Sequence, residues 1–105
     1  MTVQEAEDKA LLDMLDNINP VFRPRLIQAM QQGHELLERH RLQLTSVMDS
    51  VVWDAAYAAM RTAVISYDLS SVFPNAKHLV GTWIRLKKTL DMPAYLKERY
   101  NYELQ

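Results

Sequence analysis

The chain has 105 residues, of which 49% are hydrophobic and 24% charged, and a formal net charge of −1. These values are typical of one globular domain, spanning residues 1–105, with enough apolar surface for a single core. Cysteine is absent, which excludes disulfides and thiolate chemistry and favours a reducing, cytoplasmic compartment. We expect neither a signal peptide nor a membrane span, because the chain starts acidic and no apolar run approaches ~20 residues.

Hydrophobic spacing predicts five helices and no strands, so the expected fold is an all-α bundle of four long helices and a short C-terminal one. The first helix covers about residues 4–17, with Thr2 as its cap and Glu5 three residues later, as in a capping box. Residues 1–19 contain five acidic residues and one lysine, a net charge of −4. We expect them to complement basic faces elsewhere in the fold, and the alternative is an acidic arm that docks on a basic partner.

The second helix covers about residues 24–44, because Pro24 suits a first helical position. Gly33 lies inside it on the apolar face, where glycine costs about 1 kcal/mol relative to alanine. We expect this glycine to allow close approach by the alanines of the third helix. That contact would offset its local cost.

The third helix, residues 46–67, is apolar almost all the way round. Its alanine-rich side comprises Met48, Val52, Ala55, Ala56, Ala59 and Ala63. A second stripe comprises Trp53, Tyr57, Met60 and Val64, with Tyr67 at its edge. The alanine-rich side already supplies a packing face, so the stripe is expected to be shared with another molecule. The alternative is that the stripe belongs to the core.

The fourth helix covers about residues 74–90, and a short fifth helix follows with Asp91 as its cap and Pro93 in its first turn. Basic residues gather on these last two helices. They are Lys77, Arg85, Lys87, Lys88, Lys97 and Arg99. Direct nucleic-acid binding is not favoured, because the whole chain is slightly acidic and these residues alternate with core positions.

No pattern indicates an enzyme. His34 and Glu38 share one helix face and His40 points elsewhere, so a zinc site would lack its third ligand. The two glycines, Gly33 and Gly81, both lie within helices, which excludes a phosphate-binding loop. We therefore predict no catalytic residue, no metal and no cofactor.

Residues 46–96 resemble part of the C-terminal helical domain of glutathione transferases. Ser46-Val47-Met48-Asp49 is similar to that family's capping box, Phe73-Pro74-Asn75 to its aromatic-Pro-Asn loop, and Met92-Pro93-Ala94-Tyr95 to a later Pro-Ala turn. The thioredoxin-like domain that binds glutathione has no counterpart here. The resemblance therefore implies a helical scaffold, which could hold a small apolar ligand, and no transferase activity.

In its small size, its lack of cysteine and its predicted all-helical fold, the chain also resembles small all-helical bacterial antiactivators, such as those of quorum sensing. This resemblance implies a non-enzymatic regulator that binds a partner protein, for example a transcription regulator, and blocks its dimerisation or activity. We expect such a protein to form a homodimer and to bind through Trp53, Tyr57, Met60, Val64 and Tyr67. On this hypothesis Tyr57→Ala weakens association but leaves melting nearly unchanged.

Overall fold

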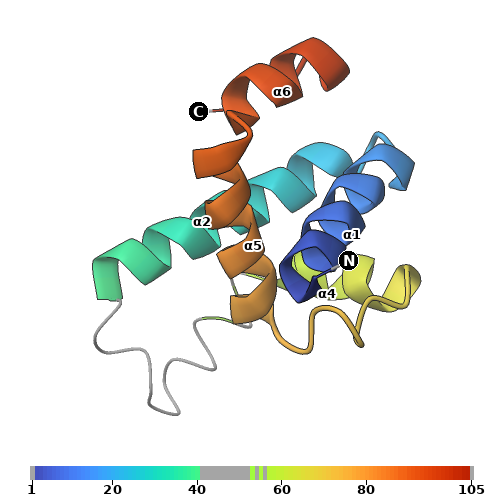
Figure 1. Ribbon diagram of the computed structural model, residues 1–105, viewed down its shortest axis with the longest axis vertical. Helices are drawn as coiled ribbons and strands as arrows, with labels where there is room; N and C mark the ends of the chain where they lie inside the picture. The colour runs from blue at the N-terminus through green and yellow to red at the C-terminus, as the bar shows by residue number, and fades with distance from the viewer. Residues whose placement is uncertain (1, 41–52, 54, 56, 105) are drawn as a thin grey trace.

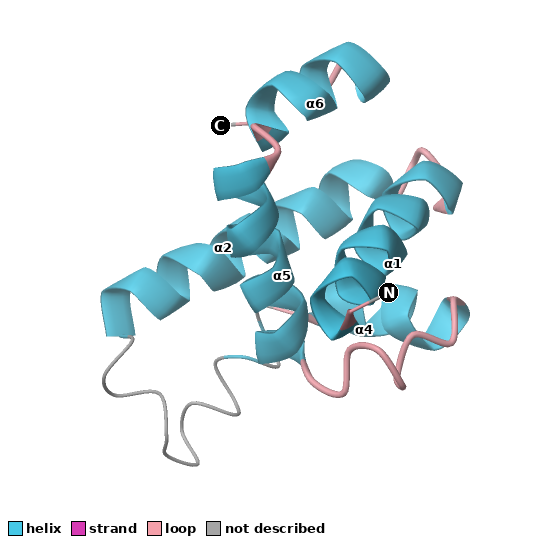
Figure 2. Cartoon of the chain, in the orientation of Figure 1, coloured by secondary structure: helices cyan, strands magenta, loops and turns pink. Residues whose placement is uncertain are grey.

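A computed structural model describes residues 2–40, 53, 55 and 57–104 of the chain. In this part of the protein all regular structure is helical, and no strand is present (Figure 2). The helices are α1 (Val3–Asn17), α2 (Arg23–His40), α4 (Ala58–Ser66), α5 (Ala76–Thr89) and α6 (Met92–Tyr100). The predicted all-α fold is therefore confirmed.

The helix ends follow mainly from local chemistry. The Thr2 hydroxyl accepts a hydrogen bond from the Glu5 backbone N–H at 3.1 Å, so the predicted cap of α1 is confirmed. Asn75 caps α5 in the same way through the N–H of His78. Asp91 occupies the N-cap position of α6, but its backbone is left-handed and its side chain makes no capping hydrogen bond. The prediction that Asp91 caps through its side chain is wrong.

Helix α5 is the centre of the fold. It packs against α1, α2 and α6, and α2 also packs against α4 (Figure 1). Trp83 of α5 is completely buried, and its indole N–H points at the side-chain oxygen of Gln31 on α2 at 3.4 Å. The fully buried aliphatic side chains around these helices include Leu11, Leu15, Leu26, Ile27, Met30, Leu79, Val80 and Leu96.

Helix α1 is held to α5 by its acidic residues. Arg85 donates to the Asp8 carboxylate at 2.6 Å and lies 3.6 Å from that of Glu7. Glu7 is only 6% exposed and also accepts a hydrogen bond from the Thr82 hydroxyl at 3.1 Å. His78 lies 3.5 Å from the same carboxylate. The acidic N-terminal region thus neutralises a basic face of its own fold, as its charge pattern predicts.

A second acidic contact joins the end of α1 to α6. Arg99 donates two hydrogen bonds to the Asp16 carboxylate, at 2.6 and 2.8 Å, and the Tyr100 hydroxyl donates a third. These donors, Arg99 first, lower the pKa of Asp16 below its ordinary value. The ionised carboxylate is therefore favoured in the folded state relative to the unfolded chain.

This contact makes stability depend on pH. Because the folded-state pKa of Asp16 is depressed, its stabilising contribution is present above about pH 4 and is lost as the pH falls through the folded value. We expect Asp16→Asn to melt below the wild type at about pH 6, and the difference to shrink as the pH falls below about 4.

Thermal melting by circular dichroism at several pH values measures this difference. Asp13→Asn is the matched control, because Asp13 is exposed and contacts Lys9 on its own helix. A gap between Asp16→Asn and wild type that stays constant down to about pH 2 would contradict the assignment.

Candidate functional site

The aromatic stripe of the third helix is part of the core. Trp53, Tyr57 and Met60 are 4%, 2% and 1% exposed. Val64 is half-buried against the same core, and Tyr67 is 37% exposed. The prediction that this stripe forms a surface for another molecule is therefore wrong for its first three residues, Trp53, Tyr57 and Met60. The fold encloses them because α2 lies closely against this side of the helix.

Gly33 is the reason that α2 can lie so close. A Cβ atom built on Gly33 would lie 2.7 Å from the ring carbon Cζ of Tyr57 and closer still to Cε1 and Oη. The Tyr57 ring thus occupies the space that a side chain at position 33 would need, and its other neighbour is the stacked ring of Trp53, with ring centroids 4.4 Å apart. We expected the alanines to make this contact, and that expectation is also wrong.

The start of α4 differs from the predicted start of the third helix. Trp53 and Ala55 are helical, but Tyr57 has φ −110° and ψ 12°, so α4 begins at Ala58. Two backbone hydrogen bonds span this position. The Tyr57 N–H donates to the Trp53 carbonyl, and the Arg61 N–H donates to the Tyr57 carbonyl. The predicted start of the helix near residue 46 lies outside the described residues.

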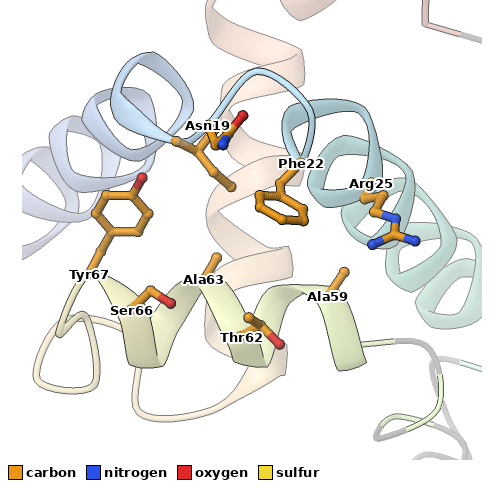
Figure 3. A pocket seen from close by; sticks show the side chains of 9 residues that line it. Asn19, Phe22, Arg25, Ala59, Thr62, Ala63, Ser66 and Tyr67 are labelled. Carbon is orange, nitrogen blue, oxygen red and sulfur yellow. The ribbon is translucent and has the colours of Figure 1, made fainter.

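The alanine-rich side of α4 borders a groove, although Ala63 on this side is itself only 4% exposed. Ala59 and Ala63 form its floor, and the opposite wall is the turn between α1 and α2 with the first turn of α2 (Figure 3). We call this hollow the α2–α4 groove; its volume is about 430 Å³. It is lined by Ile18, Asn19, Phe22, Arg25, Ala59, Thr62, Ala63, Ser66 and Tyr67.

Two aromatic side chains shape the groove. In Figure 3 the Phe22 ring points from the turn toward α4, and Tyr67 stands at the far end of the groove from Arg25. Phe22 is 47% exposed. The Tyr67 hydroxyl donates to the Asn17 carbonyl at 2.8 Å, which ties the end of α4 to the end of α1. The Tyr67 ring is thus held at the end of α4, and both rings remain partly open to solvent.

The groove carries a positive charge at one end. Arg25 is exposed, and it makes no hydrogen bond or ion pair within the part of the chain that the structure describes. Its neighbour Arg23 differs, because it donates to the Leu15 carbonyl at 2.8 Å and lies over the Tyr100 ring. Asn19, Thr62 and Ser66 add neutral polar groups to the groove. The groove can therefore hold an apolar body with one anionic group.

His34 of α2 contacts one acidic and one basic side chain. His34 lies 3.7 Å from Glu38 and 3.4 Å from the Lys87 ammonium. Burial, followed by the charge of Lys87, lowers the pKa of His34. Among the described residues no three His, Asp or Glu side chains form a group that could hold a metal ion. The side chain of His40 lies outside those residues.

The basic residues of α5 and α6 are largely engaged within the fold. Arg85 and Arg99 pair with α1, Lys97 pairs with Glu103 at 2.9 Å, and Lys87 donates to Gln31 at 3.0 Å. Lys77 lies 5.8 Å from the Trp53 ring centroid. These contacts agree with the prediction of complementary faces in one fold.

Sequence reasoning missed Phe22 and Arg25. One signal was available: Val21 and Phe22 form an apolar pair in a turn between two prolines, where no helix periodicity explains them. Val21 is 73% exposed and Phe22 is half-exposed. An apolar pair in a proline-bounded turn indicates either a buried turn or an exposed apolar surface, and here both side chains are exposed.

Fold and site together define a small all-helical protein with an open apolar groove between two helices. No protein-family model, curated protein or solved structure matches the chain. The resemblances to glutathione transferases and to antiactivators therefore stay predictions. The Ser46–Asp49 segment of the first resemblance lies outside the described residues. Within the described residues, no helix has both the length and the apolar character to cross a bilayer.

Proposed function

We propose that this protein is a non-enzymatic cytoplasmic regulator that binds a partner protein in the α2–α4 groove. The partner is, for example, a transcription regulator, and the protein blocks its dimerisation or activity by covering a helix that the partner needs. The exposed Phe22 ring beside the apolar floor of the groove carries this proposal. Aromatic side chains of this kind dominate binding energy at interfaces.

The surroundings of the groove support a protein partner. Val21 at one side and Ile65 on α4 are 73% and 71% exposed, and they add apolar surface outside the groove itself. A specific protein interface buries about 800 Å² on each partner, which is more than a groove of this volume supplies alone. The extra apolar side chains therefore suit a partner that extends past the groove.

The mechanism needs no chemistry at the site. A helix of the partner that lies in the groove cannot at the same time pack in the partner's own dimer. The effect is therefore stoichiometric and depends on the concentration of both proteins. Homodimerisation of this protein through the same apolar surface remains part of the proposal, and light scattering of the purified chain measures it.

Two substitutions of exposed apolar residues test the proposal. We expect Phe22→Ala to weaken capture of the partner from the cells that make this protein by at least about tenfold, because truncating an interface aromatic commonly costs 2 kcal/mol or more. Val3→Ala is the control, because Val3 is 74% exposed on α1 and does not line the groove. Equal capture by both variants would reject the groove as the binding site.

A small apolar ligand is the second candidate, in line with the transferase-like scaffold. The volume of about 430 Å³ favours it, because small-molecule sites commonly measure roughly 300–1,000 Å³. Saturable thermal stabilisation of a monomer by a compound such as decanoate, abolished by filling the groove with Thr62→Phe, supports this candidate over a protein partner.

A further inference from the structure

The positive charge of Arg25 at one end of the α2–α4 groove favours an acidic group in its occupant. Arg25 lies in the first turn of α2, which contains no acidic residue. A helix N-terminus is the positive end of the helix dipole, so a cation there is unfavourable by itself. Arg25 has no partner in the described chain that would offset this cost. An acidic group from another molecule would neutralise both Arg25 and the helix end.

None of the acidic side chains among the described residues pairs with Arg25. The α1 carboxylates Glu7 and Asp8 are engaged by Arg85, and Asp16 is engaged by Arg99 and Tyr100. The acidic side chains that approach α5 and α6 are thus committed to contacts away from the groove. Arg25 is also the single charged residue among the described residues that line the groove. The groove therefore favours an occupant with negative charge.

The groove geometry sets the spacing between the apolar and the acidic groups. Tyr67 stands at one end and Arg25 at the other, with Phe22 between them (Figure 3). Along α4, Ala59 and Ser66 mark these two ends, and seven residues of helix correspond to about 10 Å. A second hollow continues along α2 and α4 through Ala29 and Ala58, so an occupant can extend further in that direction.

We infer that the α2–α4 groove binds an acidic amphipathic helix, whose apolar side chains contact Phe22 and Tyr67 and whose carboxylate pairs with Arg25. The apolar positions are i and i+3 or i+4, and the acidic position is i+7 or i+8, about two helical turns away. The small side chains of Ala59, Thr62 and Ala63 leave room for the helix. This inference rests on the proposed function and specifies its partner.

A displayed library of helical peptides, each of about 18 residues, tests the inference against the purified protein. Selection is run on the wild type, on Arg25→Glu and on Thr62→Phe, which fills the groove. We expect wild-type binders to be enriched in Asp or Glu two turns from an apolar pair. Arg25→Glu should weaken them roughly tenfold and instead select Lys or Arg at that position.

Arg25→Glu is suited to this test because it should fold at least as well as the wild type. An acidic residue in the first turn of α2 is favoured by the helix dipole, and Arg25 makes no hydrogen bond or ion pair with another described residue. Its melting temperature should equal or exceed that of the wild type. Loss of peptide binding then reports on the charge and not on folding.

The outcomes separate the inference from the proposed function. Binders that Thr62→Phe blocks, but that show no acidic preference and tolerate Arg25→Glu, overturn the inference and leave the proposed function standing. If Thr62→Phe blocks the binding of no selected peptide, both the inference and the proposed function are rejected. If decanoate stabilises the protein in an Arg25-dependent way and peptides do not bind, the site takes small carboxylates, and the helical partner is rejected.

Discussion

Replacing Gly33 by alanine is expected to destabilise the protein by about 1–3 kcal/mol, although alanine is the better helix former. The new Cβ would lie 2.7 Å from Cζ of Tyr57. The ring cannot move away easily, because it is 2% exposed and stacked on Trp53. The strain of overpacking therefore exceeds the gain of about 1 kcal/mol in helix propensity. In a domain of this size we expect a drop in melting temperature of roughly 4 °C or more.

Gly81 provides a matched control in the same protein. It also lies inside a helix, but it is exposed, and a Cβ at this position would meet no atom within 4 Å. Gly81→Ala should therefore stabilise the protein by about 0.5–1 kcal/mol through propensity alone. The two substitutions are chemically identical and opposite in sign, so differential scanning calorimetry of both variants is decisive.

A third variant assigns the effect of Gly33→Ala to Tyr57. In a Tyr57→Leu background the aromatic ring is absent, and the penalty of Gly33→Ala should shrink by an amount that the double-mutant cycle measures. Additive effects would show that the clash lies elsewhere. Stabilisation by Gly33→Ala in the wild-type background would contradict the close approach of α2 to the Tyr57 ring.

The elements of the fold could be predicted because they depend on local chemistry. The Thr2 cap of α1, the position of Pro93 in the first turn of α6 and the apolar spacing of α5 are properties of short segments. The pairing of acidic α1 with the basic helices could also be anticipated from the charge distribution, although the specific partners, such as Asp16 with Arg99, could not.

The orientation of the third helix could not be predicted because it is set by another helix. Both of its sides are apolar, so periodicity gives no preference between them. The structure places the Tyr57 ring in the space that a side chain at Gly33 would occupy. The same orientation turns Ala59 and Ala63 toward the turn that contains Phe22. The site thus arises from a tertiary contact that neither segment shows alone.

Replacing Tyr57 by alanine is expected to cost about 3–5 kcal/mol of stability, as for other large aromatic side chains removed from a core. This revises the hypothesis that Tyr57→Ala affects association alone, since Tyr57 is 2% exposed. Total stabilities of such domains are about 5–15 kcal/mol, so the variant should unfold at much lower urea concentration. A midpoint close to that of the wild type would contradict the buried position.

Tyr57→Phe separates the ring from its hydroxyl. The Tyr57 Oη atom is buried and has no hydrogen-bond partner among the described residues, and burial raises the pKa of this phenol. An unsatisfied buried polar group costs about 1–3 kcal/mol, so its removal should leave stability unchanged or raise it, with the ring still filling the space beside Gly33. Urea denaturation at constant m-value measures this. A loss of more than about 1 kcal/mol would mean that the hydroxyl makes a stabilising hydrogen bond, and the packing of α2 on α4 would then need a polar contribution beside the glycine.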